Sequence, residues 1–110
     1  MRPIHWVNFT WGRHPGLMLS TRERMLVNPL VTVIPGQSEE NLELVAQMVL
    51  GYHEGLPHQT YFAVDEVLSV NAYLVEDEIG VMGLDREPEL LEKLTNAWGL
   101  HRPGGFPTQW

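Results

Sequence analysis

The sequence contains no cysteine among its 110 residues. That absence excludes disulfides, thiolate metal ligands and a cysteine nucleophile. No run of about 18 apolar residues is present either, so the sequence predicts no membrane-spanning helix. The first residues, "MRPIHWVNFTW", are too polar for the apolar core of a signal peptide. We therefore predict a cytoplasmic protein with no membrane partner.

Several motifs of catalysis and cofactor binding are also missing. No glycine-rich loop leads from a predicted strand into a helix, which leaves no cradle for a nucleotide. Ser20, Ser38 and Ser69 lie outside any nucleophile-elbow pattern. The acidic residues do not have the alternating spacing of a calcium-binding loop. The sequence thus predicts no cofactor.

Two histidines in "GYHEGLPHQTY" invite comparison with a zinc motif, which needs two histidines about four residues apart on one helix. His53 and His58 are five positions apart, and Gly55 and Pro57 break any helix between them. A loop with two ordinary histidines is the better interpretation. A metal site at these histidines, or an enzyme completed by a second chain, stays open as a minor alternative.

Charge is distributed unevenly along a chain of formal net charge −7. Residues 1–38 contain four arginines against one acidic residue, whereas residues 39–93 contain thirteen acidic residues against two basic ones. This asymmetry predicts an acidic face able to attract a basic partner. The simpler interpretation is that the acidic side chains solvate the surfaces of helices.

The composition, 44% hydrophobic and 19% charged, suits one globular domain over residues 1–110. Aromatic and β-branched residues predict strands over residues 4–11 and 30–34. Two short apolar pieces, "GLMLS" and "RMLVN", predict a hairpin between those strands. Apolar spacing predicts helices over residues 39–53, with Ser38 as the N-cap, and over residues 86–98, with Asp85 as the N-cap.

Residues 64–78, "VDEVLSVNAYLVEDE", fit both periodicities. As a helix they place Val67, Leu68, Asn71, Leu74 and Val75 on one face; as a strand they place Leu68, Val70, Ala72 and Leu74 on one face. The length of the run and Asp65 as an N-cap favour the helix.

Three segments in order, "FAVDEVLSVNAYLVEDE", "GVMGLDREPELLEKL" and "RPGGFPT", resemble the N-terminal part of a Doc-type (death-on-curing) protein of the Fic/Doc family. The resemblance covers residues 61–110 and leaves residues 1–60 unmatched. It implies helices over residues 64–78 and 86–98, followed by a flap over residues 102–108 that helps to position a target protein. The fold class expected on this basis is α+β: a small N-terminal strand set with one helix, then two helices of the Fic/Doc type.

The catalytic signature of that family is absent, because the chain contains no Asp-Gly-Asn and no His-x-Phe. The resemblance therefore implies a catalytically incomplete protein, not an enzyme, that acts by binding another protein in a toxin–antitoxin context. The alternative hypothesis is a small acidic inhibitor of the phage type that mimics nucleic acid and binds a host nucleic-acid enzyme. Direct binding of nucleic acid is not expected, since the overall charge repels phosphate.

Arginine and aromatic side chains dominate many protein interfaces. We therefore predict protein-binding residues in the closing segment and in the acidic stretch near residue 77: Arg102, Phe106, Trp110, Glu76, Asp77 and Glu78. Packing of Phe106 and Trp110 back onto the body of the protein is the competing interpretation. A modest core in a chain of this length also makes a homo-oligomer an option.

Overall fold

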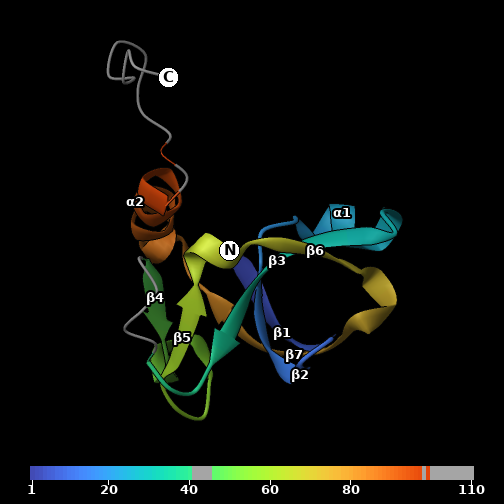
Figure 1. Ribbon diagram of the computed structural model, residues 1–110, viewed down its shortest axis with the longest axis horizontal. Helices are drawn as coiled ribbons and strands as arrows, with labels where there is room; N and C mark the ends of the chain where they lie inside the picture. The colour runs from blue at the N-terminus through green and yellow to red at the C-terminus, as the bar shows by residue number, and fades with distance from the viewer. Residues whose placement is uncertain (41–45, 98, 100–110) are drawn as a thin grey trace.

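The computed structural model describes residues 1–40, 46–97 and 99. Seven strands and two α-helices make up most of the described chain (Figure 1). The strands are β1 (Arg2–Phe9), β2 (Gly12–Met18), β3 (Leu30–Gln37), β4 (Gln47–Leu50), β5 (Thr60–Ala63), β6 (Leu68–Asn71) and β7 (Val75–Met82). The helices are α1 (Arg22–Val27), α2 (Glu87–Ala97) and the short 3-10 helices η1 (Tyr52–Glu54), η2 (Val64–Glu66), η3 (Ala72–Leu74) and η4 (Leu84–Arg86).

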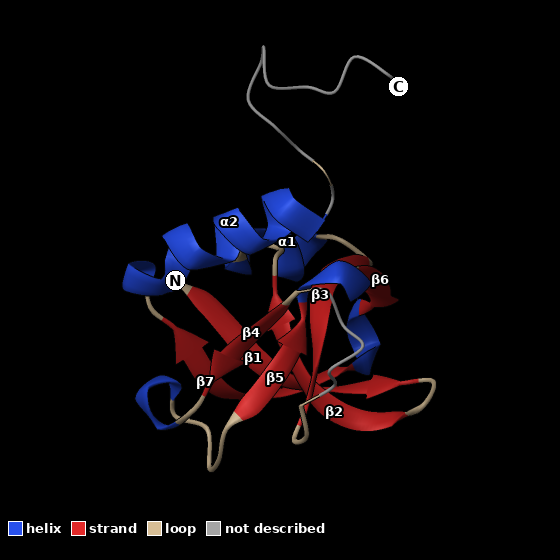
Figure 2. Cartoon of the chain, turned by 60° about the vertical axis from the view of Figure 1, so that its left-hand side comes forward, coloured by secondary structure: helices blue, strands red, loops and turns tan. Residues whose placement is uncertain are grey.

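All strands belong to one antiparallel sheet, which curls on itself (Figure 2). The order along the sheet is β4-β5-β3-β2-β1-β7, and β6 also pairs with β3. Strand β3 therefore has three partner strands. It pairs with β6 at its beginning, with β2 in its middle and with β5 at its end. The β1–β7 pairing joins residues 68 to 80 positions apart in the sequence, and its register shifts around His5.

The two faces of the sheet bury two apolar clusters, as expected from the alternation of side chains along a strand. On one face Ile4, Leu17 and Ile34 lie opposite one another across β1, β2 and β3. On the other face Val7, Met18 and Val33 join Val31 and Val70, which β3 and β6 place opposite each other.

Helix α2 covers the first of these clusters. Leu90 is fully buried in it, and Leu94 and Ala97 pack against it. Figure 2 shows α2 lying across the ends of the strands. The predicted helix over residues 86–98 is confirmed over Glu87–Ala97, because its apolar residues recur at helical spacing and meet this cluster. No helix in the described part of the chain is long and apolar enough to cross a membrane.

The predicted helix over residues 39–53 is wrong where the structure describes it. Residues 41–45 lie outside the described residues, and Gln47–Leu50 form strand β4. Buried side chains there alternate, with Met48 and Leu50 inside. Met48 lies opposite Phe62 of β5, so the backbone hydrogen bonds are satisfied between strands rather than within a helix.

The predicted helix over residues 64–78 is also wrong. The segment forms η2, β6, η3 and the first half of β7. Its strand periodicity prevails because β3 supplies a partner: Val70 lies opposite Val31, and Leu68 opposite Val33. This pairing removes the structural basis of the Fic/Doc resemblance.

The strands predicted over residues 4–11 and 30–34 are confirmed as β1 and β3. The hairpin between them is wrong, since "GLMLS" falls largely in β2 and "RMLVN" falls largely in helix α1, which Thr21 caps through a hydrogen bond from the Arg24 N–H. The expected α+β class is therefore corrected to a mostly β fold with one C-terminal helix.

Candidate functional site

The tip of the β1–β2 hairpin presents an exposed aromatic ring. Trp11 stacks on Phe9 with ring centroids 4.6 Å apart and an interplanar angle of 7°. Phe9 is buried, whereas 55% of Trp11 is exposed. Gly12 follows with φ 132°, a conformation that L side chains rarely adopt, so a glycine is needed for the turn that presents Trp11.

Strands β2 and β3 separate close to this tip. Their last pair is Gly16 with Pro35, and β3 then pairs with β5 at Gly36 and Gln37. Continued pairing would have placed His14 opposite Gln37. Both side chains instead lie just beyond the last pair, on neighbouring strands that have begun to diverge.

A cavity of about 90 Å³ occupies this divergence, and we call it the His14 cavity. Glu66 reaches it from η2, the 3-10 helix that carries the chain from β5 to β6. Gly36 is needed in its wall, since a Cβ there would lie 2.7 Å from Phe62 Cε1. The complete lining is Trp11, His14, Pro35, Gly36, Gln37, Ala63 and Glu66.

The chemistry of the His14 cavity is that of proton transfer. An imidazole exchanges protons near neutral pH. The carboxylate of Glu66 accepts protons and hydrogen bonds, and the amide of Gln37 both donates and accepts hydrogen bonds. A cavity lined by an imidazole and a carboxylate beside an exposed aromatic ring is suited to a ligand that has both a planar group and an ionisable group.

Beside the hairpin, Glu76 of β7 joins β1 to β2. Its Oε1 accepts a hydrogen bond from Arg13 Nε at 2.6 Å, and its Oε2 accepts one from Asn8 Nδ2 at 2.9 Å. Arg13 also lies over the Trp6 ring, 4.6 Å from its centroid. The hydrogen bonds from Asn8 and Arg13 lower the pKa of Glu76 below its ordinary value.

A second ion pair, between Glu78 and Arg22, ties β7 to helix α1. Arg22 Nη1 donates to Glu78 Oε1 at 2.5 Å, and His5 Nε2 lies 3.7 Å from the same oxygen. The hydrogen bond with Arg22 lowers the pKa of Glu78 and raises that of Arg22. Arginines of the basic N-terminal part thus neutralise carboxylates of the acidic part, which weakens the predicted acidic face.

The predicted protein-binding residues fall into two groups. Glu76, Asp77 and Glu78 are exposed on strand β7 rather than at the end of a helix, and two of them are paired within the chain. The closing-segment residues Arg102, Phe106 and Trp110 lie outside the described residues. The structure does not bring Glu76, Asp77 or Glu78 into the His14 cavity.

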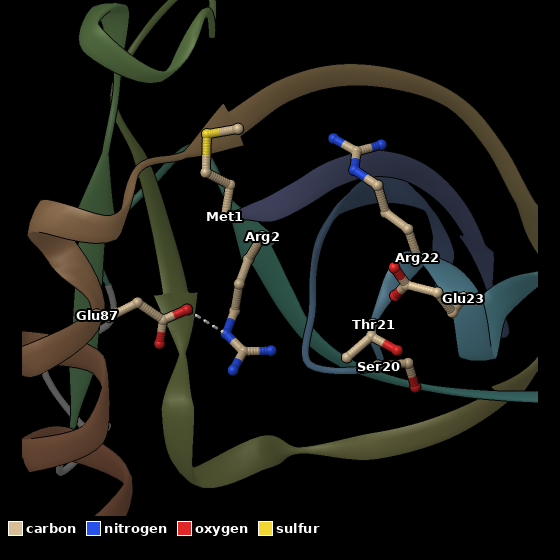
Figure 3. Close-up of a pocket in the computed structure, with 7 residues that line it drawn as sticks. All are labelled: Met1, Arg2, Ser20, Thr21, Arg22, Glu23 and Glu87. Carbon is tan, nitrogen blue, oxygen red and sulfur yellow. Dashed lines mark ion pairs between the residues drawn. The ribbon is translucent and has the colours of Figure 1, made fainter.

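A larger cavity of about 390 Å³ lies near the N-terminus, and Figure 3 shows seven residues that line it. Its two arginines are already paired: Arg2 Nε lies 2.7 Å from Glu87 Oε1, and Arg22 binds Glu78. His53 and His58, the pair compared with a zinc motif, are exposed elsewhere. In residues 1–40, 46–97 and 99 there is no group of three residues suited to hold a metal ion.

Comparison with known proteins gives a match in structure only. No family model and no curated protein matches the sequence. A solved structure titled "Mycobacterium tuberculosis toxin MazF-mt6" aligns with a TM-score of 0.82 and 24% identity, covering 92% of this chain and 100% of that one. A mycobacterial "Endoribonuclease in complex with its cognate antitoxin" aligns with a TM-score of 0.75 and 17% identity, covering 92% and 95%. A "MazE-MazF (Form-III)" structure from Deinococcus radiodurans aligns with a TM-score of 0.71 and 22% identity, covering 90% and 94%.

The chain has the MazF fold. The resemblance to the Fic/Doc family is therefore wrong, because that family is built on a helical domain and this chain on a curled sheet. The prediction that the chain is not an enzyme is corrected with it, since chains of this fold include an endoribonuclease. The acidic inhibitor of the phage type finds no support in these comparisons.

Sequence reasoning missed Trp11, His14, Gln37 and Glu66 as one site. The available signal was local: a tryptophan within the breaker cluster "TWGRHPG" is an unusual residue for a turn. No local sequence signal indicates that His14, Gln37 and Glu66 line the same cavity, because this arrangement depends on where β2 and β3 separate.

Proposed function

We propose that this chain is an RNA-cleaving toxin of the MazF type, held in check by a protein antitoxin. Two findings support the proposal. The fold agrees over the whole length of the MazF-mt6 structure, and one chain of the same fold is titled an endoribonuclease in complex with its cognate antitoxin. The toxin–antitoxin context expected from the sequence is retained in this form.

The observation that carries the proposal is the His14 cavity beside Trp11. Proteins that cleave single-stranded RNA must hold a base and act on the adjacent phosphodiester. Trp11 offers a flat exposed ring for a base, and the cavity next to it contains His14, Gln37 and Glu66. The arrangement therefore places a stacking surface and acid–base groups side by side.

The reaction proposed is attack by the ribose 2′-hydroxyl on the neighbouring phosphorus. A bond forms between O2′ and phosphorus, the bond from phosphorus to O5′ breaks, and a 2′,3′-cyclic phosphate and a 5′-hydroxyl result. One group must take the proton from the 2′-hydroxyl and another must give a proton to O5′. His14 and Glu66 are the two groups at the cavity able to move these protons, and the Gln37 amide is placed to donate a hydrogen bond to a phosphate oxygen.

RNA as the substrate replaces the expectation that nucleic acid is not a partner. The overall charge of −7 remains unfavourable for phosphate. Affinity would therefore come largely from stacking on Trp11, a contribution that does not depend on net charge.

The partner and the setting are part of the proposal. A protein antitoxin fits the earlier expectation of a protein partner, and self-association and a cytoplasmic location are retained with it. For contacts with the partner we keep the predicted residues: Arg102, Phe106, Trp110, Glu76, Asp77 and Glu78.

The test is cleavage of a long synthetic transcript by the purified chain, with mapping of the new ends. We expect discrete cuts, products with a 5′-hydroxyl, and loss of cutting when the nucleotide before the cut carries a 2′-deoxyribose. The His14→Ala variant should cut at least about a hundredfold more slowly, the usual effect of losing an acid–base group. His58→Ala, which changes an exposed histidine outside the cavity, is the matched control.

Two results would refute the proposal. One is a transcript that stays intact with wild-type protein of verified fold. The other is equal cutting by the wild type and by His14→Ala, which would assign the activity to a contaminant or to another site.

A further inference from the structure

A second cavity lies beside the hairpin tip and shares Trp11 with the His14 cavity. Its volume is about 200 Å³, and we call it the Asn71 cavity. Residues of the β1–β2 tip form one side, and residues of β6 and η3 form the other. The two cavities therefore share one lining residue, Trp11.

Most of the wall of the Asn71 cavity is apolar. Phe9 and Trp11, which stack on each other, contribute aromatic surface, and Leu74 of η3 contributes aliphatic surface. A volume of about 200 Å³ is below the range of about 300–1,000 Å³ that accommodates drug-sized ligands. One ring system is therefore the appropriate size of occupant.

Four positions of the lining carry polar side chains: Asn8, Thr10, Ser69 and Asn71. The Asn8 amide nitrogen donates to Glu76 Oε2 at 2.9 Å, so the orientation of this amide is fixed and its Oδ1 is left as an acceptor. Glu76 is held in turn by Arg13. Asn8 is thus a preorganised hydrogen-bonding group.

Asn71 is the polar residue of this lining whose side-chain amide can both donate and accept a hydrogen bond without first breaking one. It is exposed at the end of β6 and directly precedes η3, yet its side chain makes no capping hydrogen bond to that helix. An unengaged amide offers a donor and an acceptor in one plane, the pattern that recognises the edge of a nucleobase.

We propose that the Asn71 cavity binds one nucleobase of the RNA next to the cleaved phosphodiester, and that Asn71 selects this base through its edge. The inference rests on the proposed function, because it names a subsite for the same substrate. The base lies against Trp11 and Phe9, the Asn71 amide binds its edge, and Asn8 Oδ1 accepts from a donor on the base. Cleavage specificity then depends on Asn71 and not only on the His14 cavity.

The first arm of the test compares cleavage of a randomised RNA pool by the wild type and by variants at residue 71. The wild type should prefer one base at a fixed position relative to the cut. Asn71→Ala should weaken that preference about tenfold, and Asn71→Asp, which replaces the donor by an acceptor, should change the preferred base. Asn96→Ala, on the exposed surface of α2, should cut as the wild type does.

The second arm is independent of cleavage. Trinucleotides with 2′-O-methyl riboses lack the attacking hydroxyl, so they bind without being cut. Their addition should shift the side-chain amide signals of Asn71 in nitrogen–proton spectra and leave those of Asn96 in place.

The outcomes separate the inference from the proposed function. The inference is overturned if both Asn71 variants cut the pool with the base preference of the wild type, or if the pool is cut but the Asn71 signals do not shift. In either case the proposed nuclease activity stands. An intact pool together with shifted Asn71 signals refutes the nuclease and supports the base-binding cavity. An intact pool with unmoved signals overturns both.

Discussion

Trp11 lies nearly parallel to Phe9, with ring centroids 4.6 Å apart and an interplanar angle of 7°, and this contact fixes an exposed indole at the tip of the β1–β2 hairpin. Trp11 lines two cavities, the His14 cavity and the Asn71 cavity. Because the buried ring of Phe9 supports it from behind, the outer face of Trp11 is held ready for a ligand without further ordering.

We predict that Trp11→Ala weakens binding of single-stranded RNA about 10- to 100-fold, the effect of losing one stacked base. The melting temperature should change little, since more than half of the indole is already exposed, at 55%. Fluorescence anisotropy with a 2′-O-methyl oligonucleotide measures the affinity. Tyr52→Ala removes another exposed ring and should bind as the wild type does; equal binding by Trp11→Ala would remove the indole from the site.

Glu54 gives a prediction about stability. Its Oε1 accepts a hydrogen bond from the Gly51 N–H at 2.6 Å, and its Oε2 lies 3.6 Å from Arg86 Nη1. Glu54→Ala leaves the amide and the guanidinium without this partner, so we expect the free energy of unfolding to fall by about 2 kcal/mol. Urea unfolding measures it, with Glu92→Ala on the exposed face of α2 as control. A loss no larger than that of the control would contradict this role for Glu54.

Gly80 of β7 gives a second prediction about stability. A Cβ at this position would overlap the backbone oxygen of Glu54, and backbone cannot move aside cheaply. Gly80→Ala should therefore cost about 1–3 kcal/mol, the range for overpacking. Gly83→Ala is the matched control, since its added Cβ would meet only the mobile carboxylate of Asp85. Thermal and urea unfolding should show a larger loss of stability for Gly80→Ala than for Gly83→Ala. A larger loss for Gly83→Ala would contradict this role for Gly80.

The ion pairs of β7 predict a pH dependence. Hydrogen bonds from Asn8 and Arg13 lower the pKa of Glu76 below its ordinary value of 4.5. The hydrogen bond from Arg22 likewise lowers the pKa of Glu78. A lowered pKa in the folded state adds stability above the unfolded value, and that stability is lost as the pH falls through the folded value. The wild type should therefore melt above the Glu76→Gln/Glu78→Gln variant at pH 6, and the difference should close toward pH 3.

Salt provides the control for this prediction. Both pairs lie at the surface, so 1 M NaCl at pH 6 should narrow the same difference by screening. A difference between the two proteins that persists unchanged at pH 3 would show that the substitutions act through packing rather than through charge.

Local sequence was sufficient for β1, β3 and α2. The first two are rich in β-branched and aromatic residues, and the third combines helical spacing with an apolar cluster to cover. The absence of cysteine, the missing nucleotide motifs and the uneven charge could also be read directly from the chain. Each of these features depends on residues close to one another in the sequence.

Tertiary structure alone decided the secondary structure of the segment from Gln47 to Met82. It also decided which residues come together in the candidate site. A strand needs a partner for its backbone hydrogen bonds, and β7 finds that partner in β1, at the other end of the sequence. A segment such as residues 64–78, whose pattern fits both a helix and a strand, therefore takes the form that β3 and β1 impose on it. His14 and Gln37 meet for the same reason, since the end of the β2–β3 pairing brings them to one cavity.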